Sequence, residues 1–325
     1  MAFLIGTDEA GYGPALGPLV ITATAWECRL REVDLFELLA EVVTDSPQLA
    51  KRGVDEPRLL IADSKVACRS GKTEHIERSV LMLLEAAYGR RPKTLSELVE
   101  MVMPSAEKDF LQRHFWLKGR AVTLPLTPSN AQDEITSELR DRFSEACSRC
   151  GVKLNQIRST ILLPPEFNAG VEQHGNKATL LSDRTLRLAS DLMLHRSDDI
   201  LIQCDKHGGR SYYMPMITKA LTDCHVEIVT EFPAQSVYKW KQSKRDFEIR
   251  FTAKGEGQLP VALASMVSKY VREVFMVAWN DFWIEQIPSI KPTKGYPQDA
   301  KRFLDEINDI VESKRLSRSD FVRSC

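Results

Sequence analysis

The N-terminal stretch AFLIGTDEAGYGPALGPLVITATAW, residues 2–26, constrains the fold more than any other part of the chain. Two runs rich in Ile, Val, Leu and Thr, residues 2–7 and 18–26, are separated by a turn that contains several glycines and prolines. This pattern predicts two strands joined by a long loop, so we expect the chain to open as an antiparallel pair. Two adjacent carboxylates, Asp8 and Glu9, stand where the first apolar run ends.

The rest of the chain alternates between helix and strand patterns. Apolar residues at helical spacing predict helices over residues 33–43, 73–89, 96–103, 130–150, 177–195, 214–222, 260–283 and 297–314. Further strands are predicted over residues 119–126, 157–164, 198–205 and 226–232. This order predicts an α/β fold with a mixed sheet flanked by helices, in which residues 90–150 form an insertion or lobe.

A second predicted strand also delivers a carboxylate to its end, because the run DDILIQCD stops on Asp205 before a Gly-Gly turn. Neighbours on a strand point to opposite faces, so we expect Asp8 and Glu9 to share a site only where the strand ends and the backbone bends. If the two strands lie side by side, three carboxylates converge and repel one another unless a divalent cation neutralises them. Oxygen ligands favour Mg²⁺ or Mn²⁺. The alternative is that these acids are solvated turn residues.

Composition adds several limits. At 325 residues with 43% hydrophobic and 27% charged residues, the chain has the make-up of a globular protein with a sizeable core. No apolar run approaches the roughly 18 residues of a membrane span, and the N-terminus lacks a secretion signal, so we expect a cytoplasmic protein without a membrane partner. The net charge of -1 means that a nucleic-acid contact requires a local basic face. Seven irregularly spaced cysteines favour reduced thiols.

Several segments in order along the chain carry a family resemblance. The segment GTDEAGYGPALGPLV, residues 6–20, resembles the signature of the type 2 ribonuclease H (ribonuclease HII) family. Further segments are similar to later motifs of that family: ADSK at 62–65, ILIQCD at 200–205, ALASMVSKYVRE at 262–273, KGYPQDAKRFLDEI at 294–307 and RSDF at 318–321. These matches leave mainly residues 90–150 uncovered.

The resemblance implies an RNase H-like fold, with a catalytic domain over residues 1–285 and a C-terminal helical extension over residues 286–325 that completes the substrate site. It implies an endoribonuclease that uses two Mg²⁺ or Mn²⁺ ions. Such an enzyme cuts RNA in RNA/DNA hybrids or at ribonucleotides embedded in duplex DNA, and leaves 5′-phosphate and 3′-hydroxyl ends. One alternative is a non-catalytic hybrid-binding adaptor with the same fold, and another is a metal nuclease acting on a different nucleic acid.

Four positions match the family's metal-site acids. Asp8, Glu9 and Asp205 match three of them directly. The fourth falls on Glu256 in KGEGQLPVALAS if one residue is deleted between Pro260 and Ser265. Glutamate in place of the family's aspartate keeps an oxygen ligand and adds a methylene group. The alternative for Glu256 is a solvated loop residue.

The resemblance also assigns substrate contacts. The family's Gly-Arg-Gly turn approaches the ribose 2′-OH through its backbone, and here Tyr12 replaces the arginine between Gly11 and Gly13. Backbone contact is still expected, whereas a phosphate-directed charge is lost, which leaves open the preference between a single ribonucleotide and a longer RNA stretch. Tyr296 matches the tyrosine that packs on the sugar beside the cleaved junction.

Lysines and basic clusters are candidates for phosphate contact. Lys65 and Lys206 are predicted neighbours of the phosphate or leaving group, with surface ion pairs as the alternative. The clusters KWKQSKR, with Lys239, Lys241, Lys244 and Arg245 around Trp240, and KPTKGY, with Lys291 and Lys294, are predicted to touch nucleic acid or to form solvated faces.

Two further features are not expected to belong to the site. Cys147 and Cys150 in CSRC are expected to be free thiols on a helix, because no second pair of ligands follows at zinc-site spacing. His207 is expected to be a surface histidine, with proton transfer as the alternative.

Overall fold

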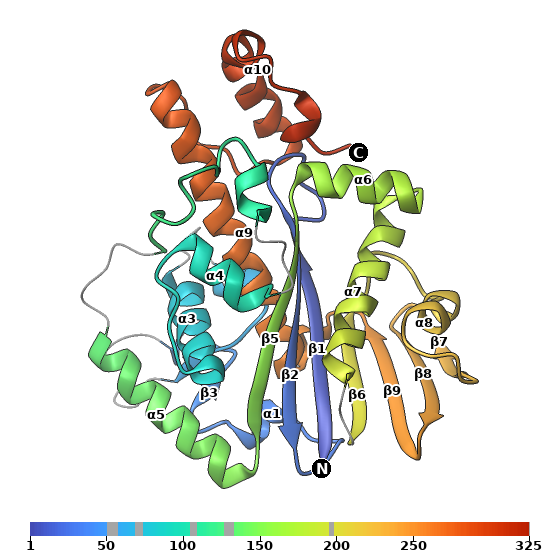
Figure 1. Cartoon of the computed structure of the whole chain (residues 1–325). Helices are drawn as coiled ribbons and strands as arrows, with labels where there is room; N and C mark the ends of the chain where they lie inside the picture. The colour runs from blue at the N-terminus through green and yellow to red at the C-terminus, as the bar shows by residue number, and fades with distance from the viewer. Residues whose placement is uncertain (51–57, 69–73, 105–108, 127–132, 195–197, 325) are drawn as a thin grey trace.

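The computed structural model describes residues 1–50, 58–68, 74–104, 109–126, 133–194 and 198–324. A seven-stranded sheet runs through the molecule in the order β5-β2-β1-β6-β9-β8-β7 (Figure 1). Its strands are β1 Ala2–Ala10, β2 Leu19–Cys28, β5 Lys153–Leu162, β6 Asp199–Asp205, β7 Glu227–Glu231, β8 Gln235–Gln242 and β9 Arg245–Thr252. Two short strands, β3 Val43–Thr44 and β4 Leu59–Leu60, pair in parallel apart from this sheet.

The sheet is mixed, as the sequence predicts. Strands β1 and β2 form the expected antiparallel pair, and β5 continues the sheet antiparallel to β2. On the other side, β1, β6 and β9 are parallel neighbours, and the antiparallel strands β8 and β7 follow. Because the carboxyl ends of parallel strands lie at the same edge, β1, β6 and β9 can deliver side chains to one place.

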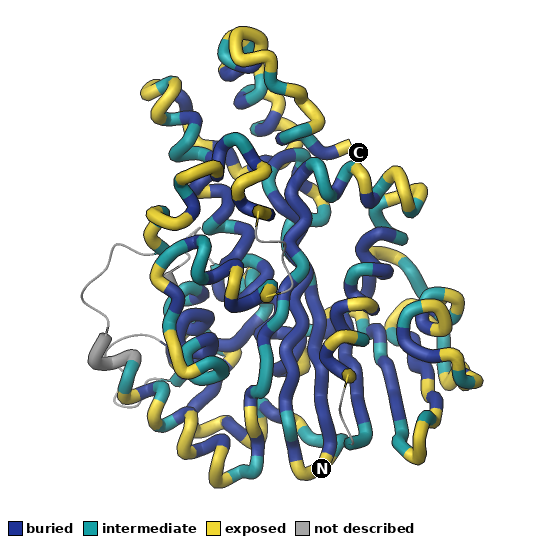
Figure 2. The backbone as a smooth tube through the Cα atoms, viewed as in Figure 1, coloured by how far each residue is buried: buried dark blue, intermediate teal, exposed yellow. Residues whose placement is uncertain are grey.

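Helices cover both faces of the sheet. The described helices are α1 Leu35–Leu38, α2 Ser64–Ala67, α3 Glu74–Tyr88, α4 Leu95–Val102, α5 Asp133–Cys150, α6 Pro164–His174, α7 Lys177–Met193, α8 Met214–Ala220, α9 Leu259–Gln286 and α10 Pro297–Ser313, with 3-10 turns η2 Phe110–Arg113, η3 Gly255–Gly257 and η4 Arg318–Asp320. Alternate residues of β1 enter two hydrophobic cores: Leu4 packs on the α9 side, and Phe3 and Ile5 pack on the α7 side. Figure 2 shows the central strands β1, β2 and β6 buried between these helices.

The N-terminal end of α9 lies directly on β1. A Cβ on Gly6 would stand 2.2 Å from the carbonyl carbon of Pro260, so glycine is what allows this approach. Thr24 Oγ1 donates a hydrogen bond to the Pro260 carbonyl at 2.8 Å. These contacts place the first turns of α9 beside the carboxyl end of β1.

The described parts of residues 90–150 contribute to the core on the α9 side. Helices α4 and α5 confirm two predicted helices, with residues 130–132 of the second prediction outside the described part. The strand predicted over residues 119–126 is wrong, because this stretch forms turns and contributes one bridge, from Pro125 to Thr94. The rings of Phe115 and Trp116 lie 6.4 and 5.4 Å from that of Trp279. The segment therefore packs against aromatic side chains of α9.

Three other parts differ from the prediction. The helix predicted over residues 33–43 is wrong beyond α1, because the chain then turns into β3. Helix α6, which starts at two prolines, was not predicted, and its first residue, Pro164, had been included in the strand predicted over residues 157–164. The β8–β9 hairpin was missed because Ser243 and Lys244 make its turn at φ of 53° and 66°, without a glycine signal. No described helix is both long and apolar enough to cross a membrane.

Candidate active site

The parallel strands bring the predicted acids to one edge of the sheet. The last β1–β6 pair joins Thr7 to Cys204, so Asp8 and Asp205 come next on neighbouring strands. Strand β9 ends beside Asp205, and Glu256 follows it in η3. The Gly255 amide donates to Asp205 Oδ1 at 2.9 Å, which fixes the turn that carries Glu256 against β6.

Asp8 and Glu9 differ in one respect from the prediction. Strand β1 does not end at the acids, because its pairing with β2 continues through Ala10. It is the pairing with β6 that stops at Thr7, so the acids follow the point where β1 loses one neighbour. Asp8 is 7% exposed, and its carbonyl accepts a hydrogen bond from Ser268 of α9 at 3.1 Å. Glu9 is half-buried.

The electrostatics of these acids are those of a crowded, partly dry site. Burial, followed by repulsion from Glu9, raises the pKa of Asp8 well above its usual range. Burial and repulsion from Asp205 and Glu256 raise the pKa of Glu9 to about 7. The pKa values of Asp205 and Glu256 are also raised, chiefly by burial. The charge of Lys65 opposes the rise in the pKa of Glu9, Asp205 and Glu256, so this exposed lysine lies near the acids. Its contact with the phosphate or leaving group stays a prediction.

Asp63 is a fifth acid that the sequence reasoning missed. Its Oδ1 accepts the Lys65 amide at 2.9 Å and caps α2, and its charge contributes to the raised pKa values of Asp205 and Glu256. A hydrogen bond from Ser265 to Ser64 at 3.3 Å ties α2 to α9. The signal was present, since Asp63 stands in the same ADSK segment from which Lys65 was chosen.

The donor set fits a hard divalent cation by its chemistry. All of these groups are carboxylates, which suit Mg²⁺ or Mn²⁺, and their mutual repulsion is what a bound cation would relieve. Within the described residues, no three His, Cys, Asp or Glu side chains are grouped closely enough to hold an ion. The four predicted acids thus share one electrostatic neighbourhood, and ligation requires their side chains to close around the ion.

The glycine turn begins two residues after Glu9. Gly11 has φ of 88°, and a Cβ there would stand 2.4 Å from the Pro18 carbonyl oxygen, so the fold itself demands glycine. Gly13 is exposed, and a Cβ there would meet nothing within 4 Å. Tyr12 lies between them and is half-buried, and the Lys177 ammonium stands 5.1 Å from its ring centre. Its pKa is raised by burial and then by Glu9, which places the ring near the acids.

Tyr296 lies alongside this turn, although it comes from the other end of the chain. The Gly295 carbonyl accepts hydrogen bonds from the amides of Ala15 and Leu16 at 2.8 and 3.2 Å. Tyr296 itself begins α10 and is 53% exposed. The fold therefore joins the two segments predicted to recognise the substrate and leaves the tyrosine ring accessible.

Lys206 is held by the protein. Its ammonium is buried and donates to the carbonyls of Phe232 at 2.8 Å and Arg210 at 3.3 Å, and to Ser236 Oγ at 3.2 Å. Burial lowers its pKa. Its contact with phosphate stays a prediction, whereas the exposed Lys65 is free to reach outward.

The two basic clusters occupy different places. Lys239 and Lys241 pair with Glu248 and Asp246 at 3.6 and 3.1 Å, and Trp240 is buried in the hairpin. Because β9 starts at this hairpin, the cluster lies at the edge of the sheet opposite Asp205. Lys291 and Lys294 of the second cluster are exposed, close to Tyr296 in the chain.

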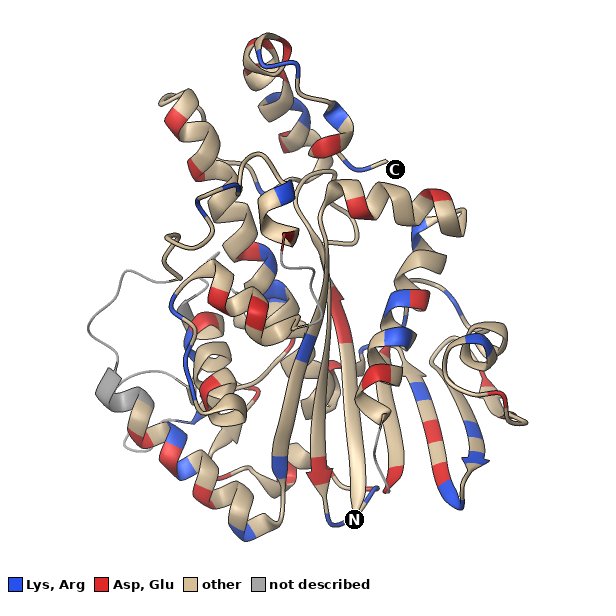
Figure 3. Ribbon diagram, in the orientation of Figure 1, with Lys and Arg blue, Asp and Glu red and all other residues tan. Residues whose placement is uncertain are grey.

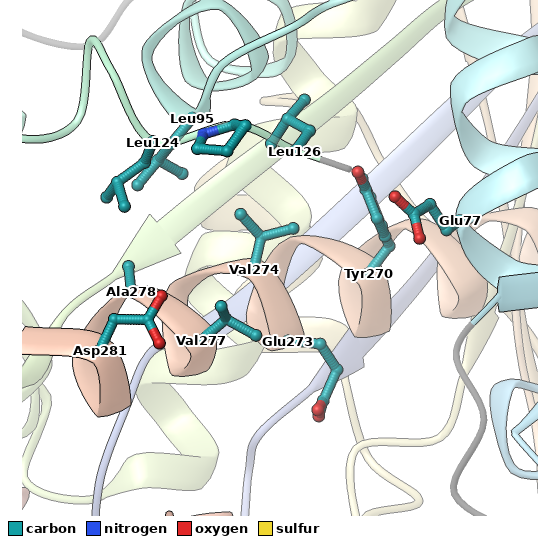
Figure 4. A pocket seen from close by; sticks show the side chains of 11 residues that line it. Glu77, Leu95, Leu124, Leu126, Tyr270, Glu273, Val274, Val277, Ala278 and Asp281 are labelled. Atoms are coloured by element: carbon teal, nitrogen blue, oxygen red, sulfur yellow. The ribbon is translucent and has the colours of Figure 1, made fainter. Parts of the chain in front are cut away.

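The remaining sequence interpretations have mixed outcomes. The prediction of a surface histidine is wrong, because His207 is buried, contacts Ser182 Oγ at 2.9 Å and has its pKa lowered to about 3 by burial. Cys147 and Cys150 are free thiols on α5, as predicted. A cavity of about 330 Å³ between α3, α4 and α9 is lined by Leu95, Tyr270, Val274 and Val277 among others (Figure 4). None of the predicted site residues lines it.

No family model and no curated protein matches this sequence. Solved structures do match. The ribonuclease H2 structure from Pyrococcus horikoshii OT3 is 13% identical and has a TM-score of 0.47, covering 98% of this chain and 92% of that one. The PCNA:RNase HII complex from Archaeoglobus fulgidus is 11% identical and has a TM-score of 0.40, covering 99% of this chain and 93% of that one. Bst-RNase HIII in complex with Mn²⁺ is 14% identical and has a TM-score of 0.42, covering 99% of this chain and 66% of that one. At this level of likeness, function is inferred from the chain's own residues.

Proposed function

We propose that this chain is a metal-dependent endoribonuclease of the type 2 ribonuclease H class. Its substrate is RNA in an RNA/DNA hybrid, or a ribonucleotide embedded in duplex DNA. The observation that carries the proposal is the convergence of Asp8, Glu9, Asp205 and Glu256 at the carboxyl edge of β1, β6 and β9. The ordered sequence motifs from residue 6 to residue 321 support the choice of substrate.

Each acid has a role at this edge. Asp8, Glu9, Asp205 and Glu256 would hold two Mg²⁺ or Mn²⁺ ions, which when bound activate water and stabilise the departing 3′-oxygen. Asp8 is buried in β1, and its carbonyl accepts a hydrogen bond from Ser268 of α9. Asp63 adds negative charge beside Asp205 and strengthens the attraction for cations.

Substrate is oriented by residues outside the acid group. The exposed Gly13 leaves room for a backbone approach to the ribose 2′-OH, and the exposed ring of Tyr296 offers a surface to the neighbouring sugar. Lys65 and Lys294 are exposed cations within this region and suit phosphate contacts. Lys177 above Tyr12 places a further cation at the turn. Such cleavage would leave 5′-phosphate and 3′-hydroxyl ends.

The second candidate is a hybrid-binding adaptor that does not cut. It is favoured by the absence, in the described ranges, of three acid, thiol or imidazole side chains already grouped for an ion. It shares every substrate contact with the enzyme and differs in having no turnover.

The test compares two labelled duplexes, one with a single embedded ribonucleotide and one a full RNA/DNA hybrid, incubated with Mg²⁺, Mn²⁺ or a chelator. The proposal expects cleavage by the wild type that needs the metal, and retained binding without cleavage by Asp8→Asn. Binding without cleavage by the wild type in every metal would overturn it in favour of the adaptor. Cleavage of duplexes without any ribonucleotide would overturn the substrate class.

A further inference from the structure

The loop that carries the glycine turn is braced from the C-terminal end of the chain. Arg323, which is 4% exposed, donates from Nε and Nη2 to the Gly17 carbonyl at 2.8 and 2.6 Å and from Nη1 to the Gly11 carbonyl. Gly11 and Gly17 are the two ends of the loop. One guanidinium therefore ties the ends together, which a point charge such as lysine cannot do with the same geometry.

Arg272 of α9 connects the same turn to the segment before Tyr296. It is 2% exposed, and its Nη2 donates to the Lys294 carbonyl at 2.8 Å. A Cβ on Gly11 would stand 2.8 Å from Arg272 Nε, so the guanidinium lies against the turn. In the described part of the chain, Arg272 Nε has no hydrogen-bond partner. The side chain thus spans the gap between the Gly11 backbone and the Lys294 backbone.

The segment that carries Arg323 is itself held in place. Its amide donates to the Ala15 carbonyl at 2.9 Å, and the preceding Val322 forms an antiparallel bridge with Leu16. Asn168 of α6 donates to the Val322 carbonyl at 2.9 Å and accepts from the Ser324 amide at 2.7 Å. The C-terminal segment is therefore sandwiched between α6 and the loop.

Burying the Arg323 guanidinium at the loop costs folding free energy. The Arg323 guanidinium lies 4.8 Å from the ring centre of Phe167, and no carboxylate pairs with it among the described residues. Burial and the nearby charge of Arg272 lower the pKa of Arg323 to about 9. A buried cation without an acidic partner costs folding free energy that an apolar side chain would not. Stability alone therefore does not account for Arg323 at this place, whereas Arg272 also pairs with the Glu273 carboxylate at 3.2 Å.

We propose that Arg323 and Arg272 are positioning residues that hold the Gly11–Gly13 backbone at a fixed distance from Tyr296, and that they thereby set discrimination between ribose and deoxyribose. The inference rests on the proposed function, because the turn is the element expected to meet the 2′-OH. Recognition of one hydroxyl by backbone atoms depends on placement to well under 1 Å. A loop tied at both ends has that precision, and an untied loop does not.

The test uses Arg323→Met, which keeps the length of the stem and removes the donors, and Arg323→Lys, which keeps the charge without the fork. Arg318→Met is the matched control, because Arg318 is exposed and bonds Asn308 at 3.0 Å, away from the loop. Each variant is made in the wild type for kinetics and with Asp8→Asn for binding. The dissociation constant is measured for a duplex with one ribonucleotide and for the same duplex in DNA alone.

We expect Arg323→Met to lower the preference for the ribonucleotide duplex roughly tenfold, since small displacements at a recognition site have effects of this size or larger. Affinity for the DNA duplex changes by less than about twofold, because Arg323 is buried and the variant leaves the exposed lysines that suit phosphate contacts in place. The preference of Arg323→Lys for the ribonucleotide duplex should lie between those of Arg323→Met and the parent, and Arg318→Met should match the parent. An unchanged preference in either folded Arg323 variant, or an equal loss for both duplexes, would overturn the inference.

Hydrogen exchange gives a readout without substrate. We expect faster exchange of the amides of residues 11–17 in Arg323→Met, while the amides of β1 and α9 exchange as in the wild type. Unchanged exchange there would overturn the bracing role. If Arg323→Met does not fold, Arg323→Lys decides both measurements. If the wild type neither cuts nor prefers ribose, the proposed function fails, and the exchange experiment still decides whether Arg323 braces the loop.

Discussion

Two buried carboxylates show how much their surroundings matter. Asp8 at the carboxyl edge of β1 is 7% exposed, and Glu248 in the middle of β9 is 2% exposed. Glu248 is surrounded by cations: Arg250 Nε stands 2.6 Å from its carboxylate, Arg31 3.4 Å and Lys239 3.6 Å. Asp8 is surrounded by other acids, which raise its pKa together with burial.

This difference separates an acid that neighbouring cations neutralise from an acid that lies among other acids. Figure 3 shows both signs of charge along β8 and β9, where each buried or exposed acid has basic neighbours. Such a face is neutralised by the protein itself and has no need of a ligand. At the carboxyl edge of β1, β6 and β9 the negative charge is concentrated, and a cation from solution is what would balance it.

The largest expected effect tests this contrast through activity. Asp8→Asn should lower turnover roughly a hundredfold or more, because it removes an ion ligand and a charge that is organised for the transition state. It should also raise the melting temperature of the metal-free protein, since one of the repelling charges is gone. Glu248→Gln should leave turnover within about twofold of the wild type. Steady-state kinetics of both variants make the comparison, and equal losses in the two would show that the acid edge has no special role.

Glu248→Gln, which should leave turnover nearly unchanged, should lower the stability of the fold. Glu248→Gln leaves the cationic groups of Arg31, Lys239 and Arg250 without their shared partner, and these are partly exposed. We expect the free energy of unfolding to fall by about 1–3 kcal/mol. Urea denaturation of the metal-free protein measures this change. A Glu248→Gln protein as stable as the wild type would mean that the charged face of β8 and β9 contributes little.

The contrast also explains what the sequence could and could not predict. The acids Asp8, Glu9 and Asp205 were predictable, because each stands where an apolar run ends, and ends of parallel strands meet. Asp63 was missed although it stands in the ADSK segment from which Lys65 was chosen, because no long strand delivers it and its place at this edge depends on the docking of α2 on α9. The hairpin around Glu248 was missed because its turn lacks glycine, although Phe247, Ile249 and Phe251 of β9 alternate with polar residues as in a half-buried strand.

The C-terminal contacts were beyond sequence reasoning for a different reason. An arginine is expected at the surface, so nothing in the sequence marks Arg272 and Arg323 as buried. His207 was misjudged for the same reason, since the sequence does not show that it is buried. A motif, and not a propensity, identified Tyr296 and Gly11, and their substrate contacts stay predictions.

The rise in melting temperature on adding metal should depend on pH, and the raised pKa of Glu9 determines the direction of this dependence. Its value is raised from 4.5 to about 7 in the folded state, so the folded protein keeps a proton that the unfolded chain has already lost in this window. The free energy of unfolding of the metal-free protein should therefore fall as pH rises from about 4.5 to 7. Mg²⁺ or Mn²⁺ binds the ionised carboxylates, so the metal should raise the melting temperature more at pH 8 than at pH 5.

Thermal melts with and without metal at the two pH values measure this difference. Glu248→Gln is the control, because it should keep the metal response, whereas Asp8→Asn should lose most of it. A metal response that is as large at pH 5 as at pH 8 would contradict titration of the acid edge in this range.

The smallest expected effect compares two lysines. Lys177 stands over Tyr12 near the acid edge, and no carboxylate pairs with it in the described residues, whereas Lys241 pairs with Asp246 at the opposite edge. If Lys177 meets a phosphate, Lys177→Met should weaken hybrid binding about two- to threefold and reduce the slope of log affinity against log salt by about 1. Lys241→Met should change neither quantity. Titrations of the labelled hybrid at several salt concentrations measure both, and equal slopes for the two variants would place the phosphate path away from Tyr12.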